Sequence, residues 1–152
     1  MNVGYRLVKK KRIDQAFDGE GARLYGGRWN SKGKSCIYLA STASLALLEV
    51  MVHLNDYELL SRYILFQIKL PDSSLLKFDL NSLPKDWKND PAPFSTAQIG
   101  DDWITDQSSL GLYVPSTIMP IENNILLNPN HPDFEKSLKT IEKVIFNPDP
   151  RL

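Results

Sequence analysis

The chain has 152 residues, of which 42% are hydrophobic and 24% charged, so it can bury a core and is not expected to be disordered. Its 18 basic residues balance 18 acidic ones, which argues against a global attraction to nucleic acid or to an anionic membrane. A single cysteine, Cys36, excludes an internal disulfide, and no Cys/His cluster has the spacing of a zinc site, so no metal is expected.

Targeting segments are not expected either. The start, MNVGYRLVKKKR, lacks the apolar segment of a secretory signal. No apolar run approaches the ~20 residues that are needed to span a bilayer. These features predict one cytoplasmic domain over residues 1–152, with no membrane partner and no direct nucleic-acid partner.

In the first third of the chain, the hydrophobic pattern predicts two strands and a helix. Residues 3–8 (VGYRLV) and 35–40 (SCIYLA) have the apolar and β-branched content of strands. The segment between them is polar and holds five of the eight glycines, so it is predicted as a loop. Ser41 or Thr42 is placed to cap a helix that runs to about Asn55.

Further strands and a second helix are predicted in the middle of the chain. Residues 63–70 (YILFQIKL) give the clearest strand pattern, and residues 75–80 (LLKFDL) predict another strand. Residues 81–94 contain three prolines and are predicted as a loop. Thr96 is placed to cap a helix over residues 97–109.

The last third predicts a strand at 112–116 (LYVPS) and a turn at 128–134 (NPNHPDF). Residues 134–146 fit two structures, because their apolar spacing suits a helix and their β-branched content suits a strand. The sum is an α+β fold in which strands outnumber helices.

Glu49 is unusual because it is the single carboxylate in the apolar segment LALLEVMV. The predicted helix around it has no wide polar face, so it is expected to be buried on most sides. Ala46, Glu49 and His53 share one narrow face at helical spacing. This face either meets solvent at an edge or projects the carboxylate into a cleft. His53 is expected to be structural or exposed rather than catalytic.

The segment YGGRWN, residues 25–30, has the composition of an anion site. Its two glycines permit a positive φ or a close approach to a ligand. Arg28 can form bidentate bonds to a phosphate or a carboxylate, and Trp29 offers a flat apolar surface. The alternative is an ordinary tight turn with an exposed arginine.

Ser116 lies between two prolines in LYVPSTIMP. The chain has no G-x-S-x-G nucleophile elbow and only two histidines, so Ser116 is a poor candidate for a triad nucleophile. It is predicted to supply a hydrogen bond, and the alternative is a structural serine after a proline.

Together these stretches resemble one family, the RES domain. FDGEGARLYGGRWNSKGKSCIYLA followed by SLALLEVMVHL is similar to the core of that domain, and VPSTIMPIENNILLNPNHPDF and NPDPRL are similar to its C-terminal half. RES domains are the toxin half of bacterial RES–Xre toxin–antitoxin modules. The resemblance implies a compact fold of mainly antiparallel sheets with a few helices, like diphtheria-toxin-type ADP-ribosyltransferases. It also implies NAD⁺ as the substrate, growth arrest as the outcome and an Xre-type (helix-turn-helix) antitoxin as the partner.

The resemblance assigns roles to five residues of this chain. Arg28, Glu49 and Ser116 correspond to the arginine, glutamate and serine of the family name, and Tyr38 corresponds to its active-site tyrosine. Glu49 is expected at the nicotinamide ribose, Arg28 at the phosphates or ribose, Tyr38 as a stacking wall and Ser116 as a positioning hydrogen bond. An ion pair between Arg28 and Glu49 in the free protein is one alternative. Arg6 is a weaker candidate for a phosphate contact.

The expected reaction is hydrolysis of the nicotinamide–ribose bond of NAD⁺, with no cofactor besides this substrate. The alternative is transfer of ADP-ribose to a cellular protein. Leu47 stands where arginine-directed transferases carry a second acid, which argues against arginine as the acceptor. A more distant alternative is a binding module without catalytic activity.

Overall fold

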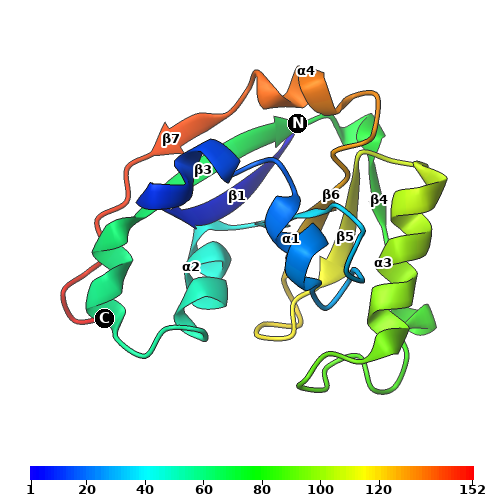
Figure 1. Cartoon of the computed structure of the whole chain (residues 1–152), viewed down its shortest axis with the longest axis horizontal. Coiled ribbons are helices and arrows are strands. Elements are labelled where there is room, and N and C mark those ends of the chain that lie inside the picture. Colours follow the sequence, from blue (N-terminus) through cyan, green and yellow to red (C-terminus); the bar gives the residue numbers. More distant parts are fainter.

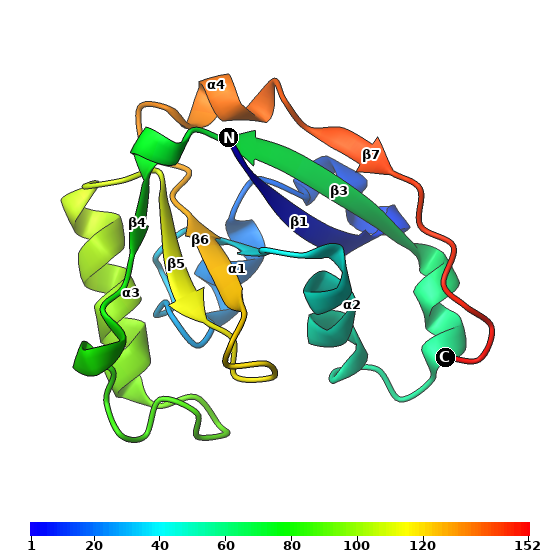
Figure 2. The same cartoon turned by 180° about the vertical axis from the view of Figure 1, so that it is seen from behind.

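The computed structural model describes residues 1–152 and contains one sheet with helices on both faces (Figures 1 and 2). The strands are β1 (Asn2–Lys9), β2 (Ile37–Ala40), β3 (Tyr63–Leu70), β4 (Leu75–Lys77), β5 (Gly111–Pro115), β6 (Asn123–Leu127) and β7 (Glu142–Val144). The helices are α1 (Glu20–Tyr25), α2 (Ala43–Met51), α3 (Phe94–Asp106) and α4 (Phe134–Leu138). Short 3-10 turns are η1 (Lys10–Gln15), η2 (Tyr57–Arg62), η3 (Asp72–Ser74) and η4 (Leu80–Ser82). No helix is long and apolar enough to cross a membrane.

The seven strands follow the order β4-β5-β6-β2-β1-β3-β7. Only β4 and β5 pair in parallel, and every other pair is antiparallel. This confirms the predicted α+β class with a mainly antiparallel sheet. The sheet is weakest between β1 and β2, where a single pair, Tyr5 and Ala40, is in register. Figure 2 shows the strands splaying apart at this junction, with β4, β5 and β6 on one side and β1, β3 and β7 on the other.

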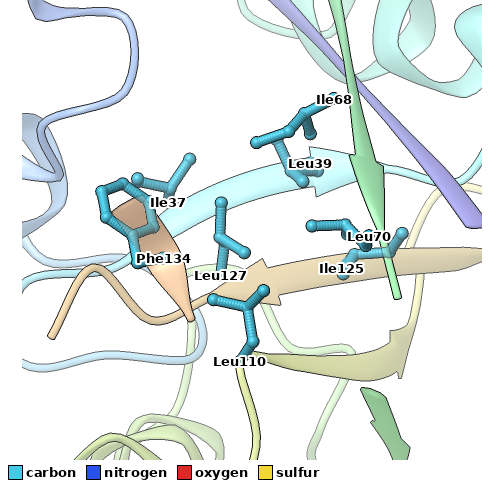
Figure 3. Packing of buried hydrophobic residues seen from close by; sticks show 8 residues of the cluster. All are labelled: Ile37, Leu39, Ile68, Leu70, Leu110, Ile125, Leu127 and Phe134. Atoms are coloured by element: carbon cyan, nitrogen blue, oxygen red, sulfur yellow. The ribbon is translucent and has the colours of Figure 1, made fainter. Parts of the chain in front are cut away.

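Alternation along the strands sends side chains to two different cores. One face of β2, β3 and β6 contributes to the largest cluster (Figure 3), which consists of Ile37, Leu39, Ile68, Leu70, Leu110, Ile125, Leu127 and Phe134. The residues between them point the other way. Leu126 packs there with Trp103 of α3 and with Trp29, and Tyr38 packs against this second cluster. β2 therefore presents Tyr38 to the face that carries α3 and the Trp29 segment.

Helix α2 begins as the sequence predicts, because the Thr42 hydroxyl accepts a hydrogen bond from the backbone N–H of Leu45 at 3.1 Å. It ends at Met51 rather than near Asn55. The expectation that it is buried on most sides is wrong: only Leu45 and Ala46 are buried along the helix. The reason is that α2 packs on β1 and β2 at the splayed junction, so part of its apolar surface faces a cavity instead of a core.

Two further segments in the first half of the chain differ from the prediction. The segment predicted as a loop contains η1 and α1. The strand predicted over residues 75–80 is shorter, since β4 ends at Lys77 and η4 follows.

The second half also differs. Thr96 lies inside α3, where its hydroxyl bonds to the carbonyl of Pro93, so it does not cap the helix from outside. β6, an interior strand between β5 and β2, was not predicted from the sequence. Residues 134–146 resolve into both of the structures that their pattern fits, with α4 followed by β7.

Candidate functional site

A cavity of about 950 Å³ opens where β1 and β2 separate. Its walls come from β1, β2, α1, α2 and the segments around Arg28 and Lys88. Four of the five predicted site residues line it: Arg6, Arg28, Tyr38 and Glu49. The structure thus brings together residues from four separate segments, and the cavity volume is in the upper part of the range for small-molecule sites.

Glu49 reaches the cavity from the last turn of α2 and is partly buried. Its Oε1 accepts a hydrogen bond of 3.0 Å from the hydroxyl of Ser116. Its Oε2 has no hydrogen-bond partner within the protein. The helix face of Glu49 therefore projects its carboxylate into a cleft rather than meeting solvent at an edge. One carboxylate oxygen is hydrogen-bonded and the other has no protein partner.

Ser116 is fully buried at the end of β5 and is not one of the residues that line the cavity. Its oxygen accepts two backbone N–H bonds, from Ile118 at 3.1 Å and Met119 at 3.2 Å. Since these occupy the lone pairs of the oxygen, the hydroxyl proton is committed to Glu49. Ser116 therefore fixes the orientation of the Glu49 carboxylate rather than contacting a ligand in the cavity.

Arg28 is partly buried, and its guanidinium is held on one side only. Nη1 donates to the carbonyls of Trp87 and Asn89, each at 2.8 Å. Nε and Nη2 have no partner in the protein, so they remain available to a ligand. The Arg28–Glu49 ion pair considered from the sequence is not formed. Trp29, expected as a ligand surface, is 2% exposed and belongs to the core beside α3.

Tyr38 lines the cavity from β2, but its hydroxyl is engaged inside the protein. It donates to Oδ1 of Asn30 at 2.6 Å and accepts from the backbone N–H of Trp29 at 3.0 Å. Burial raises the pKa of Tyr38 well above its usual value, so the phenol is neutral at physiological pH.

Arg6 crosses the gap between the two separating strands. Its Nε donates to the carbonyl of Ala16 at 2.6 Å and its Nη1 to the carbonyl of Tyr38 at 2.9 Å. Burial lowers the pKa of the Arg6 guanidinium. Arg6 thus bonds to backbone carbonyls where β1 and β2 no longer pair with each other. Only its Nη2 is left for the phosphate contact expected from the sequence.

Sequence reasoning missed several residues of the cavity. Arg12 and Lys88 line it without an ion-pair partner. His53 also lines it while being exposed. Asn30 holds the Arg28 segment from below and is 1% exposed. The sequence did not mark Asn30, although its partners Ala22, Ser31, Lys34 and Tyr38 all lie within eight positions of it, because no recognised motif pairs an asparagine with them.

Cys36 precedes β2 and is 1% exposed. Burial raises the pKa of its thiol to about 12, so this thiol is protonated and unreactive at neutral pH. No group of three or more His, Cys, Asp or Glu side chains is arranged to hold a metal ion. The cationic and acidic side chains around the cavity, apart from His53, are four cations and three acids: Arg6, Arg12, Arg28, Lys88, Asp18, Glu49 and Asp90.

Comparisons with known proteins agree on one family. A sequence model of the RES domain matches residues 4–149. A protein of Yersinia enterocolitica named "Toxin Res" is 47% identical over 148 residues, covering 97% of this chain and 97% of its own. A Sphingobium protein named "Prs ADP-ribosylating toxin" is 39% identical over 152 residues, covering 95% and 93%. The crystal structure of the M. tuberculosis MbcT–MbcA toxin–antitoxin complex shares the fold, with a TM-score of 0.72 and 21% identity over 95% of this chain and 81% of that one.

Proposed function

The chain belongs to the RES-domain family, and from that premise we propose that it is the toxin of a toxin–antitoxin pair and that it cleaves NAD⁺ at the nicotinamide–ribose bond. The observation that carries this proposal is the geometry of Glu49. One of its oxygens is fixed by a buried serine and the other is free in a cavity that also presents Arg28. Such an arrangement suits a reaction in which positive charge develops on a sugar.

Cleavage of this bond passes through an oxocarbenium-like state, as glycoside cleavage does. The C1′–N1 bond breaks, and nicotinamide leaves as a neutral molecule with the bonding electron pair. Water adds to C1′ and releases a proton, so the products are ADP-ribose, nicotinamide and H⁺. Because nicotinamide is already a cationic leaving group in NAD⁺, no general acid is needed to protonate it.

The residues of the cavity divide this task. Glu49 Oε2 stabilises the charge on the nicotinamide ribose or accepts a bond from its hydroxyl. Arg28 uses its free Nε and Nη2 on the phosphates or ribose, and Nη2 of Arg6 adds a weaker contact. The ring of Tyr38 supplies wall area. Ser116 acts through Glu49 as a positioning residue.

Ser116→Ala tests the orientation of the carboxylate. The variant loses a hydrogen bond to a charged group, so kcat should fall by about 10-fold or more, with a smaller change in KM. Steady-state rates of nicotinamide release measure both. The matched control is Ser109→Ala, since Ser109 is 4% exposed, makes comparable hydrogen bonds and lies outside the cavity. Equal losses of kcat in the two variants would contradict the positioning role.

Arg28→Ala should weaken NAD⁺ binding by about 10- to 100-fold, because charge-assisted hydrogen bonds to the ligand are lost. Stability should fall less, by about 1–2 kcal/mol, through the loss of the bonds to Trp87 and Asn89. Calorimetry with the substrate and thermal unfolding separate the two effects. Arg62→Ala is the control, since Arg62 is exposed and outside the cavity. Normal binding together with a lowered melting temperature would refute the assignment.

A second reaction is favoured by the name of the Sphingobium relative, which is called an ADP-ribosylating toxin. In this alternative the same cavity transfers ADP-ribose to a cellular protein instead of water. Incubation of the protein and a bacterial lysate with NAD⁺ labelled in its adenylate half separates the two reactions. Hydrolysis yields free labelled ADP-ribose, whereas transfer yields a labelled protein band. Absence of both would exclude NAD⁺ chemistry and favour a binding module.

We further propose that the partner is an antitoxin of the Xre type. The M. tuberculosis protein with this fold was solved as a toxin–antitoxin complex, which supports an antitoxin as the partner. Co-expression with a helix-turn-helix protein encoded by a neighbouring gene should restore growth. A neighbouring protein that neither binds nor restores growth would oppose this part of the proposal.

A further inference from the structure

Arg28 lies in a short loop that is closed on itself. Gly27 and Asn30 exchange two backbone hydrogen bonds across it, of 3.0 and 3.4 Å. Gly26, just before the loop, has a φ of 73° and a ψ of 175°, a conformation that is essentially restricted to glycine. The backbone on both sides of Arg28 is thus fixed before any ligand binds.

The side chain of Asn30 closes the loop from inside. Its Nδ2 lies 2.8, 3.2 and 3.1 Å from the carbonyl oxygens of Ala22, Ser31 and Lys34, and because the amide has two hydrogens, two of these carbonyls share one of them. Its Oδ1 accepts the hydroxyl of Tyr38 at 2.6 Å. The Asn30 side chain is 1% exposed, and a hydrogen bond in such a position is electrostatically stronger than in water.

The Tyr38 hydroxyl joins this amide to the residue that follows Arg28, because it also accepts the backbone N–H of Trp29 at 3.0 Å. It touches the residue before Arg28 as well. A Cβ atom on Gly27 would lie 2.6 Å from this hydroxyl oxygen and 2.9 Å from Oδ1 of Asn30. The hydroxyl therefore contacts the loop on both sides of Arg28, at Gly27 and at Trp29.

We propose that Asn30 and the Tyr38 hydroxyl act as positioning residues for Arg28, holding its guanidinium at the cavity in the orientation that binds the dinucleotide. This inference rests on the proposed function. It changes the role of Tyr38 from a ring that stacks on the substrate to a hydroxyl that acts through the arginine. It also assigns a role to Asn30, whose side chain contacts only the protein.

Tyr38→Phe distinguishes the two roles, because it removes the hydroxyl and keeps the ring. If the hydroxyl positions Arg28, KM for NAD⁺ should rise by about 10-fold while kcat changes much less. If Tyr38 acts by stacking, the variant should keep the KM of the wild type. The matched control is Tyr113→Phe, since Tyr113 is partly buried, its hydroxyl makes no hydrogen bond and it lies outside the cavity.

A double-mutant cycle tests whether the effect passes through the arginine. The Arg28→Ala/Tyr38→Phe protein should have the same KM as Arg28→Ala alone, because the hydroxyl has nothing left to position. Independent contributions would multiply, and such a result would overturn the proposal. Gly27→Ala disturbs the same contact from the other side, so it should raise KM as Tyr38→Phe does. A wild-type KM in Gly27→Ala would also contradict the proposed positioning of Arg28.

Amide hydrogen exchange separates a failure of this inference from a failure of the proposed function. In Tyr38→Phe the Trp29 amide loses its acceptor, so peptides covering residues 26–31 should exchange faster than in the wild type or in Tyr113→Phe. This readout needs no NAD⁺. If the wild type consumes no NAD⁺, the proposed function fails. Unchanged amide exchange in Tyr38→Phe would overturn the positioning role of the Tyr38 hydroxyl, whether or not NAD⁺ is consumed.

Discussion

Glu49→Gln is expected to reduce nicotinamide release by at least about 10²- to 10³-fold and to abolish NAD⁺ loss in cells, while leaving the fold intact. Glutamine has the shape of glutamate and keeps an Oε1 that can accept the Ser116 hydroxyl, so the carbonyl oxygen stays in place. The free Oε2 is replaced by an amide NH₂, which carries no negative charge and donates instead of accepting. The side chain then offers neither charge stabilisation nor an acceptor to the ribose.

The measurement is NAD⁺ in cells after induction, together with kcat of the purified variant. Glu58→Gln is the control, since Glu58 is exposed on η2 and does not line the cavity. Thermal unfolding should show similar stability for both variants and the wild type. Unchanged NAD⁺ depletion by a folded Glu49→Gln protein would remove Glu49 from the reaction.

Gly100→Ala is expected to produce the largest loss of stability, about 3 kcal/mol or more. A Cβ atom at Gly100 would lie 1.5 Å from the carbonyl oxygen of Trp29 and 2.6 Å from its carbonyl carbon. Both are backbone atoms, so no side-chain rotation relieves the overlap. Helix α3 or the loop carrying Arg28 must move instead, and because α3 also packs on β5 and β6, that movement opens the core.

Denaturant unfolding of Gly100→Ala measures this loss. Gly21→Ala is the control for stability, since Gly21 lies in α1 and a Cβ atom there would meet nothing within 4 Å. That variant should gain up to about 1 kcal/mol, because alanine loses less backbone entropy than glycine in a helix. A Gly100→Ala protein as stable as the wild type would mean that α3 packs less closely on the Trp29 segment than the structure shows.

The elements with strong local patterns were predicted well. β3 has the predicted bounds because YILFQIKL is long, apolar and flanked by polar turns. Thr42 caps α2 as predicted, since capping depends on residues within one turn. β6 was missed because NNILL is short and has no alternation, and its strand conformation depends on pairing with β2 and β5.

In the candidate site, too, local features were predicted and long-range contacts were not. The sequence singled out Arg28, Glu49 and Ser116 from composition and spacing, and the resemblance added Tyr38 and Arg6. It gave no indication that Ser116 bonds to Glu49 across 67 positions of the chain or that Arg28 bonds to Trp87 rather than to Glu49. These contacts depend on where the strands β1 and β2 separate, which no local pattern encodes.

By itself, the sequence determined the α+β class, the family and the residues whose side chains could take part in binding or catalysis. It could do so because composition, periodicity and motif order can be read along the chain without knowing the fold. Only the tertiary structure decided what those residues do for one another. In the fold, one oxygen of Glu49 has no protein partner, Trp29 is buried, and the Tyr38 hydroxyl donates to Asn30. The physical reason is that a hydrogen-bonding group has few donors and acceptors, and the fold alone determines which partners lie within about 3 Å.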